Sequence, residues 1–266
     1  MPRNRKQAYN MKQMNAGISQ ESQSMDVLRS LLAMANDEKW SDSQHTFIRS
    51  IQTLPNPLFL VSGTTTQFQN LKAYCTSELV SSVLTVDPTF NIGKYSVTPI
   101  THQDLLLVSK RTGEHPICIG PILISQNLTN DVYADYVYCI QKNCPGLKDK
   151  LRVFGTDGEK PLEQSVSEGF PFSIKLRCMS HFRKNVKEHL KFLVDSNKSK
   201  IANQIFGYHT VEGICNEGMV DADAPEMFDS LYESVRQDWE KKWPTFVRWF
   251  DTTTSMIKQE MLANGL

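Results

Sequence analysis

The chain lacks most of the features that identify membrane, secreted or nucleotide-binding proteins. Its 266 residues include no apolar run near the ~20 residues that a membrane span needs. The basic start of the chain is not followed by an apolar stretch, so we expect no signal peptide. A P-loop, a Rossmann fingerprint, an HExxH motif and a GxSxG motif are all absent. These absences predict an intracellular protein that makes no membrane contact.

Net charge and cysteine content do not identify a function or a partner either. The 29 Lys and Arg residues balance 29 Asp and Glu residues, so a nucleic-acid partner would need a local basic patch. The six cysteines are scattered and form no CxxC pair. Because a chain of this length does not depend on disulfides for its core, we predict that they are reduced thiols.

What the sequence does contain is an alternation of short apolar runs and helical patterns. This order predicts an α/β fold, with a mixed sheet flanked by helices. The segment 95–108 fits either one interrupted strand or two short ones. Strands are expected at 58–61, 65–74, 83–87, 95–100, 104–108, 117–125, 151–156 and 172–177, and helices at 25–36, 43–50, 131–143, 161–168 and 179–194.

The composition divides the chain into four parts. These are a polar tail at 1–24, a helical lead-in at 25–57, an α/β core at 58–195 and an all-helical segment at 196–266. The tail fits a helix in a longer context or, as we expect, disorder. The last segment carries Trp239, Trp243 and Trp249, which could stack on bases. The spacing of four between the first two favours packing inside this segment.

Two aspartates directly follow apolar runs. Asp87 is followed by Pro88, and Asp157 is followed by Gly158, so each acid is expected where a buried strand stops. Two such carboxylates from one sheet can hold a divalent metal, which would clamp a phosphoryl group. The alternative is that each aspartate caps the next turn. Sequence alone does not decide whether the two strands are neighbours.

A cysteine and a histidine lie three residues apart at a predicted strand-to-helix junction. Cys178 and His181 would share one face of the helix and could donate two zinc ligands. A closed zinc site needs two more, for which Cys215, His209 and His189 are available. The alternative is a buried thiol beside a helix-start histidine, and we do not expect zinc.

Basic residues continue along the same predicted helix. Lys184, Lys187 and Lys191 form one stripe, and Arg183 lies beside it. Such a stripe could contact DNA phosphates. An ordinary solvated helix face explains it equally well.

Taken in order, three motifs resemble the transposase domain of Mutator-like elements (MULE), which belongs to the DDE class of DNA transposases. The motifs are Val86-Asp87-Pro88-Thr89-Phe90, Thr156-Asp157-Gly158-Glu159 and Cys178-Met179-Ser180-His181. The resemblance covers residues 58–262. It implies a ribonuclease H-like mixed sheet flanked by helices and followed by a helical insertion-like segment.

The resemblance also implies a metal, a reaction and a partner. Asp87 and Asp157 would be the first two metal-binding acids, and Mg²⁺ or Mn²⁺ would activate water or a 3′-hydroxyl for attack on a DNA phosphodiester. DNA, as transposon ends and target, is the implied partner of a nuclear protein that could form a homo-oligomer. The role of Cys178 and His181 stays open.

One part of the family pattern is absent. The family's third acid lies in a Glu-Ser-x-Asn setting beyond the insertion, and no such string occurs here. We therefore expect a fragment or a domesticated derivative that ends before its third acid. It would be weakly active alone unless Glu212 or Glu233 reaches the two aspartates. The alternatives are a non-catalytic DNA-binding or protein-interaction module, and a metal-dependent nuclease unrelated to transposition.

Overall fold

The computed structural model of the chain describes most of the residues after position 46. The described residues are 29–30, 32–34, 36, 47–53, 57–79, 81–88, 90–92, 94–193, 195–209 and 215–262. The expected tail at 1–24 and the candidate acid Glu212 lie outside them. Within the expected helix at 25–36, every described residue is helical. No described helix has the length and apolar character needed to cross a bilayer.

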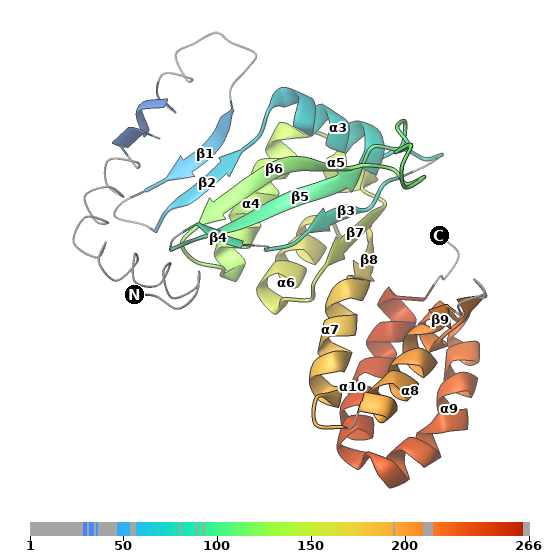
Figure 1. The fold of residues 1–266 in the computed structure, drawn as a ribbon. Coiled ribbons are helices and arrows are strands. Elements are labelled where there is room, and N and C mark those ends of the chain that lie inside the picture. Colours follow the sequence, from blue (N-terminus) through green and yellow to red (C-terminus); the bar gives the residue numbers. More distant parts are fainter. Residues whose placement is uncertain are drawn as a thin grey trace, which may run out of the picture.

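The core is an eight-stranded mixed sheet (Figure 1). Seven strands lie side by side in the order β1-β2-β6-β5-β3-β7-β8, and β4 pairs with β5. Neighbours from β1 to β3 are antiparallel, whereas β3, β7 and β8 are parallel. The strands are β1 Ile48–Gln52, β2 Phe59–Ser62, β3 Leu84–Val86, β4 Phe90–Ile92, β5 Tyr95–Gln103, β6 Ile117–Ser125, β7 Val153–Thr156 and β8 Ile174–Arg177. The expected α/β class and mixed sheet are confirmed.

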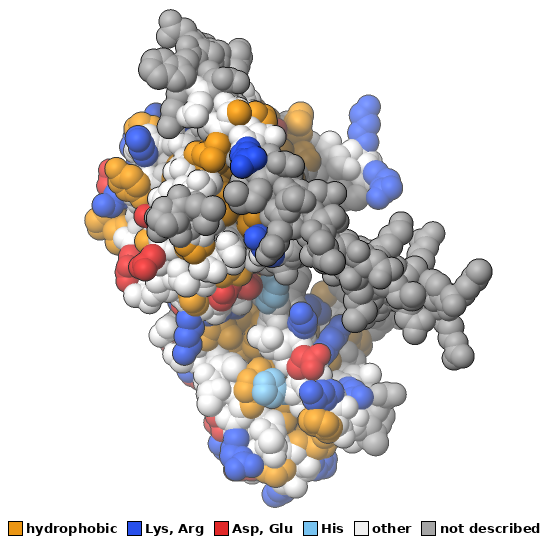
Figure 2. All heavy atoms as spheres, turned by 90° about the vertical axis from the view of Figure 1, so that its left-hand side faces the viewer, with side chains coloured by type: hydrophobic (Ala, Val, Ile, Leu, Met, Phe, Trp, Pro, Cys, Tyr) orange, Lys and Arg blue, Asp and Glu red, His pale blue; other side chains and the backbone are white. Residues whose placement is uncertain are grey.

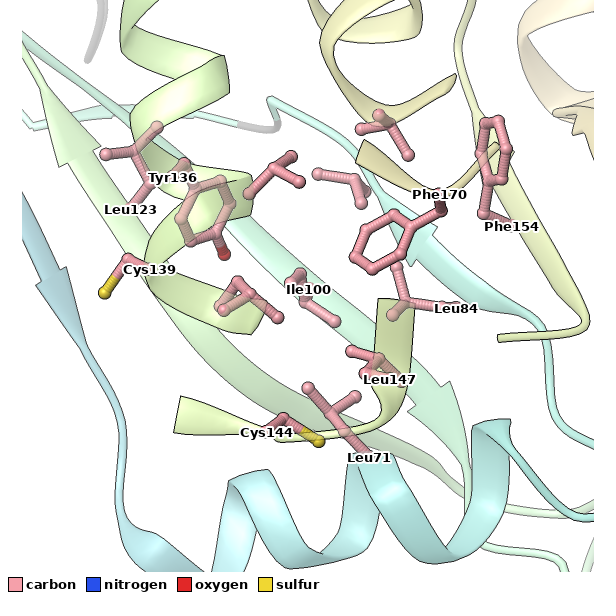
Figure 3. Packing of buried hydrophobic residues seen from close by; sticks show 14 of the residues in the cluster. Leu71, Leu84, Ile100, Leu123, Tyr136, Cys139, Cys144, Leu147, Phe154 and Phe170 are labelled. Atoms are coloured by element: carbon pink, nitrogen blue, oxygen red, sulfur yellow. The ribbon is translucent and has the colours of Figure 1, made fainter. Parts of the chain in front are cut away.

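Helices pack against this sheet through one hydrophobic core. They are α3 Thr65–Cys75, α4 Asn130–Asn143, α5 Leu147–Lys150 and α6 Lys160–Gly169. Figure 3 shows Leu71 of α3 and Tyr136 of α4 among the strand residues Leu84, Ile100 and Phe154. In β3, Leu84 and Val86 are buried and Thr85 between them is not, because alternate side chains of a strand point to opposite faces.

A second hydrophobic core holds the C-terminal part together. Its elements are α7 Met179–Leu190, α8 Asp195–Phe206, β9 Tyr208–His209, β10 Cys215–Asn216, the 3₁₀ helix η1 Met219–Asp221, α9 Pro225–Lys242 and α10 Pro244–Glu260. The segment is helical, as expected, except that β9 and β10 form a short antiparallel pair. Trp239 is fully buried, and Trp243 and Trp249 pack against the same core, as the spacing favoured.

The segment 65–74 is helix α3 and not a strand. Thr64 accepts a hydrogen bond from the Gln67 amide at 3.2 Å, and the Gln67 side chain accepts one from the Thr64 amide at 2.7 Å. This capping box starts the helix. Phe68, Leu71 and Cys75 then follow at helical spacing and are all buried. The polar residues between them give an alternation of apolar and polar residues that is also typical of a half-buried strand.

Two further expectations are wrong. Of the expected helix at 43–50, residues 43–46 lie outside the described residues, and residues 48–50 belong to strand β1, which pairs with the apolar strand β2 with Ile51 opposite Leu60. The expected strand at 104–108 is a turn, because the Asp104 side chain accepts a hydrogen bond from the Leu106 amide at 3.0 Å. In both cases a contact with another residue outweighs local apolar character.

Candidate metal centre

The carboxyl ends of three parallel strands meet at one edge of the sheet. β3 and β7 are neighbours, with Val86 beside Thr156. Asp87 and Asp157 therefore follow at equivalent positions of adjacent strands. Sequence left this adjacency open, and the strand register now establishes it.

The third strand of the group brings a histidine to the same edge. Arg177 at the end of β8 lies beside Thr156, and α7 begins almost at once. Cys178 is the N-cap residue of α7, and its amide donates a hydrogen bond to the Thr156 carbonyl at 3.0 Å. This contact fixes the start of the helix against β7. His181 consequently lies in the first turn of α7, next to the two strand ends.

Asp87, Asp157 and His181 converge. One carboxylate oxygen of each aspartate and one ring nitrogen of the histidine all lie within 4.8 Å of one another. In the part of the chain that the structure describes, no other three acidic, histidine or cysteine side chains come together in this way. All three side chains are partly exposed, so the group is open to solvent and to a ligand.

The donor set fits a small divalent cation. Ligands about 2.1 Å from one ion lie at most about 4.2 Å apart, so a group bounded by 4.8 Å needs only a small inward rotation. Nδ1 of His181 is buried and has no hydrogen-bond partner among the described residues. An unsatisfied buried ring nitrogen is costly, which suits a histidine that can gain a ligand.

Electrostatics point the same way. Burial raises the pKa of the Asp87 carboxyl above its ordinary value, with Asp157 raising it further and His181 opposing both. The net effect is that a negative charge at Asp87 is disfavoured. A bound cation would remove this cost, since it neutralises both carboxylates at once.

Asp157 is also a turn cap, as the alternative reading proposed. One of its oxygens, Oδ1, accepts a hydrogen bond from the Glu159 amide at 2.9 Å. A carboxylate has two oxygens and several lone pairs, so the capping bond leaves capacity for a metal. The two interpretations of Asp157 are compatible.

Glu159 is a neighbour that sequence reasoning missed. Tyr133 donates a hydrogen bond to its carboxylate at 3.3 Å. Burial raises the pKa of Glu159, and the nearby Asp157 raises it further. Its carboxylate is not among the three converging donors. The available signal was its position two residues after Asp157 in an Asp-Gly-Glu turn.

The other candidate ligands lie elsewhere. Cys178 is not among the three converging donors, although it is close to His181 in sequence. The ring of His189 stacks on Trp249 with 3.9 Å between centroids, and Cys215 is exposed on β10. Glu233 is exposed on α9 and does not join the two aspartates. All six cysteines are free, in agreement with the expected thiols.

The basic residues of α7 are exposed, which fits both a phosphate-binding stripe and an ordinary solvated helix face. Arg183 lies over the Phe206 ring at 4.4 Å, and Lys191 forms a loose ion pair with Glu188 at 3.7 Å. Lys184 and Lys187 are exposed between them. On the face shown in Figure 2, Lys and Arg side chains are numerous over the lower, helical part and are interleaved with a few acids.

No protein-family model matches this chain, and no curated protein sequence matches it significantly.

Proposed function

We propose that this protein binds Mg²⁺ or Mn²⁺ at Asp87, Asp157 and His181 and acts on DNA phosphodiesters, as the resemblance to Mutator-like transposases implies. One observation carries the proposal: adjacent parallel strands and the following helix bring these three donors within 4.8 Å of one another. A mixed sheet with its acids at strand ends is also what a ribonuclease H-like core requires. By the same resemblance the protein would act in the nucleus and could form a homo-oligomer.

Each residue has a defined task in this proposal. Asp87 and Asp157 supply the hard oxygen ligands, and His181 supplies a third donor, while no third acid among the described residues joins the group. When bound, the metal would activate the attacking oxygen and stabilise charge on the phosphoryl group. The stripe on α7 would hold the DNA backbone, because Lys191 lies only about 15 Å along the helix from His181.

The imidazole ligand predicts an ion preference. Mg²⁺ favours all-oxygen sites and keeps its waters, whereas nitrogen ligands suit first-row transition ions. A site with two carboxylates and one imidazole should therefore bind Mn²⁺ more tightly than Mg²⁺. Replacing His181 with glutamine should reduce this preference more than it reduces Mg²⁺ binding.

The first experiment is a calorimetric titration of the purified protein with Mn²⁺ and with Mg²⁺. Asp157→Asn should weaken Mn²⁺ binding by a factor of ten or more. Asp104→Asn is the matched control, because Asp104 also follows a strand and caps a turn, at 3.0 Å from the Leu106 amide. If the titration of the wild-type protein shows no Mn²⁺ binding, the proposal is wrong.

DNA assays then separate the three candidate activities. Metal-dependent joining of terminal-repeat DNA to a target would support the transposase, and cleavage without joining would favour a nuclease. Salt-sensitive DNA binding with no cleavage, in a protein that does bind Mn²⁺, would favour the non-catalytic module.

A further inference from the structure

Four charged side chains form a network where the C-terminal part meets the sheet. Lys175 and Arg177 of β8 each pair with Glu163 of α6 and with Glu260 of α10, at 2.6 to 2.9 Å. Glu260 is only 8% exposed. Burial alone would lower the pKa of Lys175, but hydrogen bonds to the two glutamates more than offset it and raise the pKa. The four side chains are therefore closely paired and partly shielded from solvent.

Arg177 is also packed over the turn that carries Asp157. Gly158 has a φ of +90°, and a Cβ added there would lie 1.1 Å from Nη1 of Arg177. The guanidinium therefore occupies the space where any other residue would place its side chain. Because Arg177 pairs with Thr156 across the strands, its side chain reaches this turn from the neighbouring strand.

Glu260 of α10 and Glu163 of α6 both contact the guanidinium, and Glu260 is its link to the C-terminal part. Glu260 accepts a hydrogen bond from Nε of Arg177 at 3.0 Å, and the same carboxylate oxygen forms an ion pair with Nη2 at 2.9 Å. Nη2 also donates a hydrogen bond to Glu163 of α6 at 2.9 Å. Contacts of Glu260 with two nitrogens of one planar group restrict the orientation of that group as well as its position. Fastening α10 to β8 does not require this, because Lys175 already pairs with Glu260 at 2.8 Å.

We propose that Glu260 positions Arg177 over the Asp157–Gly158 turn, so that the C-terminal part holds the metal-binding aspartate in place. Glu260 and Arg177 are positioning residues in this account and need not touch the metal or the DNA. The inference rests on the proposed function only for its consequence on metal binding. The restraint on the turn can be measured without any metal.

The test compares three full-length variants with the wild type by amide hydrogen exchange and by Mn²⁺ titration. Glu260→Gln removes the α10 charge that pairs with Arg177 and leaves Glu163 in place. Arg177→Lys keeps the positive charge but removes the planar group from the turn. Asp251→Asn is the matched control, since Asp251 also lies on α10 and pairs with an arginine, Arg236, at 2.9 Å. The reporter is the Glu159 amide, which is bonded to Asp157.

The proposal expects Glu159 amide exchange to accelerate about tenfold in Glu260→Gln and Arg177→Lys but not in Asp251→Asn. Mn²⁺ affinity should fall about tenfold in the same two variants. Unchanged exchange in both, or equal acceleration in the control, would overturn the proposal. A wild type that binds no Mn²⁺ would refute the proposed function, and the exchange comparison would still decide whether the turn is held.

Discussion

At the scale of single residues, the raised pKa of Asp87 predicts that its ionised carboxylate lowers the stability of the folded protein at neutral pH. Its folded-state pKa is raised by burial, so ionisation costs more in the folded chain than in the unfolded one. We expect Asp87→Asn to raise the melting temperature at pH 7 in the absence of divalent metal. The gain should shrink as pH falls through the raised pKa and disappear below the ordinary value of 3.8.

The measurement is a set of thermal melts between pH 3.5 and 7 in chelator, repeated with Mn²⁺. Metal should reverse the order, because it stabilises only the protein that binds it. Asp135→Asn is the control, because it makes the same substitution at an exposed position of α4. A destabilised Asp87→Asn at neutral pH would show that the carboxylate has a favourable partner in the fold.

At the scale of elements, α7 joins the metal centre to the basic stripe. If Lys184 and Lys187 contact phosphates, each contact releases counterions, and its loss lowers the slope of log affinity against log salt by about 0.9. The double variant Lys184→Gln/Lys187→Gln should therefore bind DNA more weakly and with a slope reduced by about two. Fluorescence anisotropy over a range of salt concentrations measures both quantities.

Lys148→Gln/Lys150→Gln provides the control, because these exposed lysines lie on α5, outside α7. Equal effects of both double variants would mean that DNA is held by diffuse charge. An unchanged slope in the α7 variant would show that Lys184 and Lys187 do not contact phosphates and belong to an ordinary solvated helix face.

Some of the strands and helices could be predicted from the sequence, and others could not. The strand ends at Asp87 and Asp157 were predictable, since apolar runs mark buried strands and Asp marks where they stop. Helix α3 was not recognised, although the pair Thr64 and Gln67 carried a capping-box signal. The apolar residues Phe68 and Leu71 are separated by polar residues that fit a strand as well as a helix.

The site was only half predictable for a different reason. That β3 and β7 are neighbours depends on long-range pairing, which no local pattern encodes. His181 was identified as part of a Cys-x-x-His motif, but its convergence with the aspartates follows from where α7 begins. Glu260, more than a hundred residues beyond Asp157, has no sequence pattern that ties it to the site.

At the scale of the whole molecule, two hydrophobic cores are joined through α7 and through the contact of α10 with β8. Buried residues on α7, among them Phe182 and Val186, belong to the second core, while the helix start carries His181. A connection this narrow predicts that the C-terminal part opens as a unit of its own. Sub-global opening of this kind is measurable by native-state hydrogen exchange.

Trp239→Ala tests this division. Trp239 is fully buried, contacts Phe246, Phe250 and Tyr232, and donates a hydrogen bond to Gln204 at 3.1 Å. Removing this side chain should lower the free energy of unfolding by about 3–5 kcal/mol. Amide protons of α8, α9 and α10 should lose a corresponding amount of protection against hydrogen exchange. Amide protons of β3 and β7 should lose much less.

Trp243→Ala is the comparison, because Trp243 is only partly buried at the junction of α9 and α10 and should cost less. Equal loss of protection across both cores in Trp239→Ala would mean that the chain unfolds as one cooperative body. The divided outcome has a consequence for the metal centre. A loosened C-terminal part would release Glu260 and, with it, the restraint on Arg177, so Mn²⁺ affinity should fall although β3 and β7 stay folded.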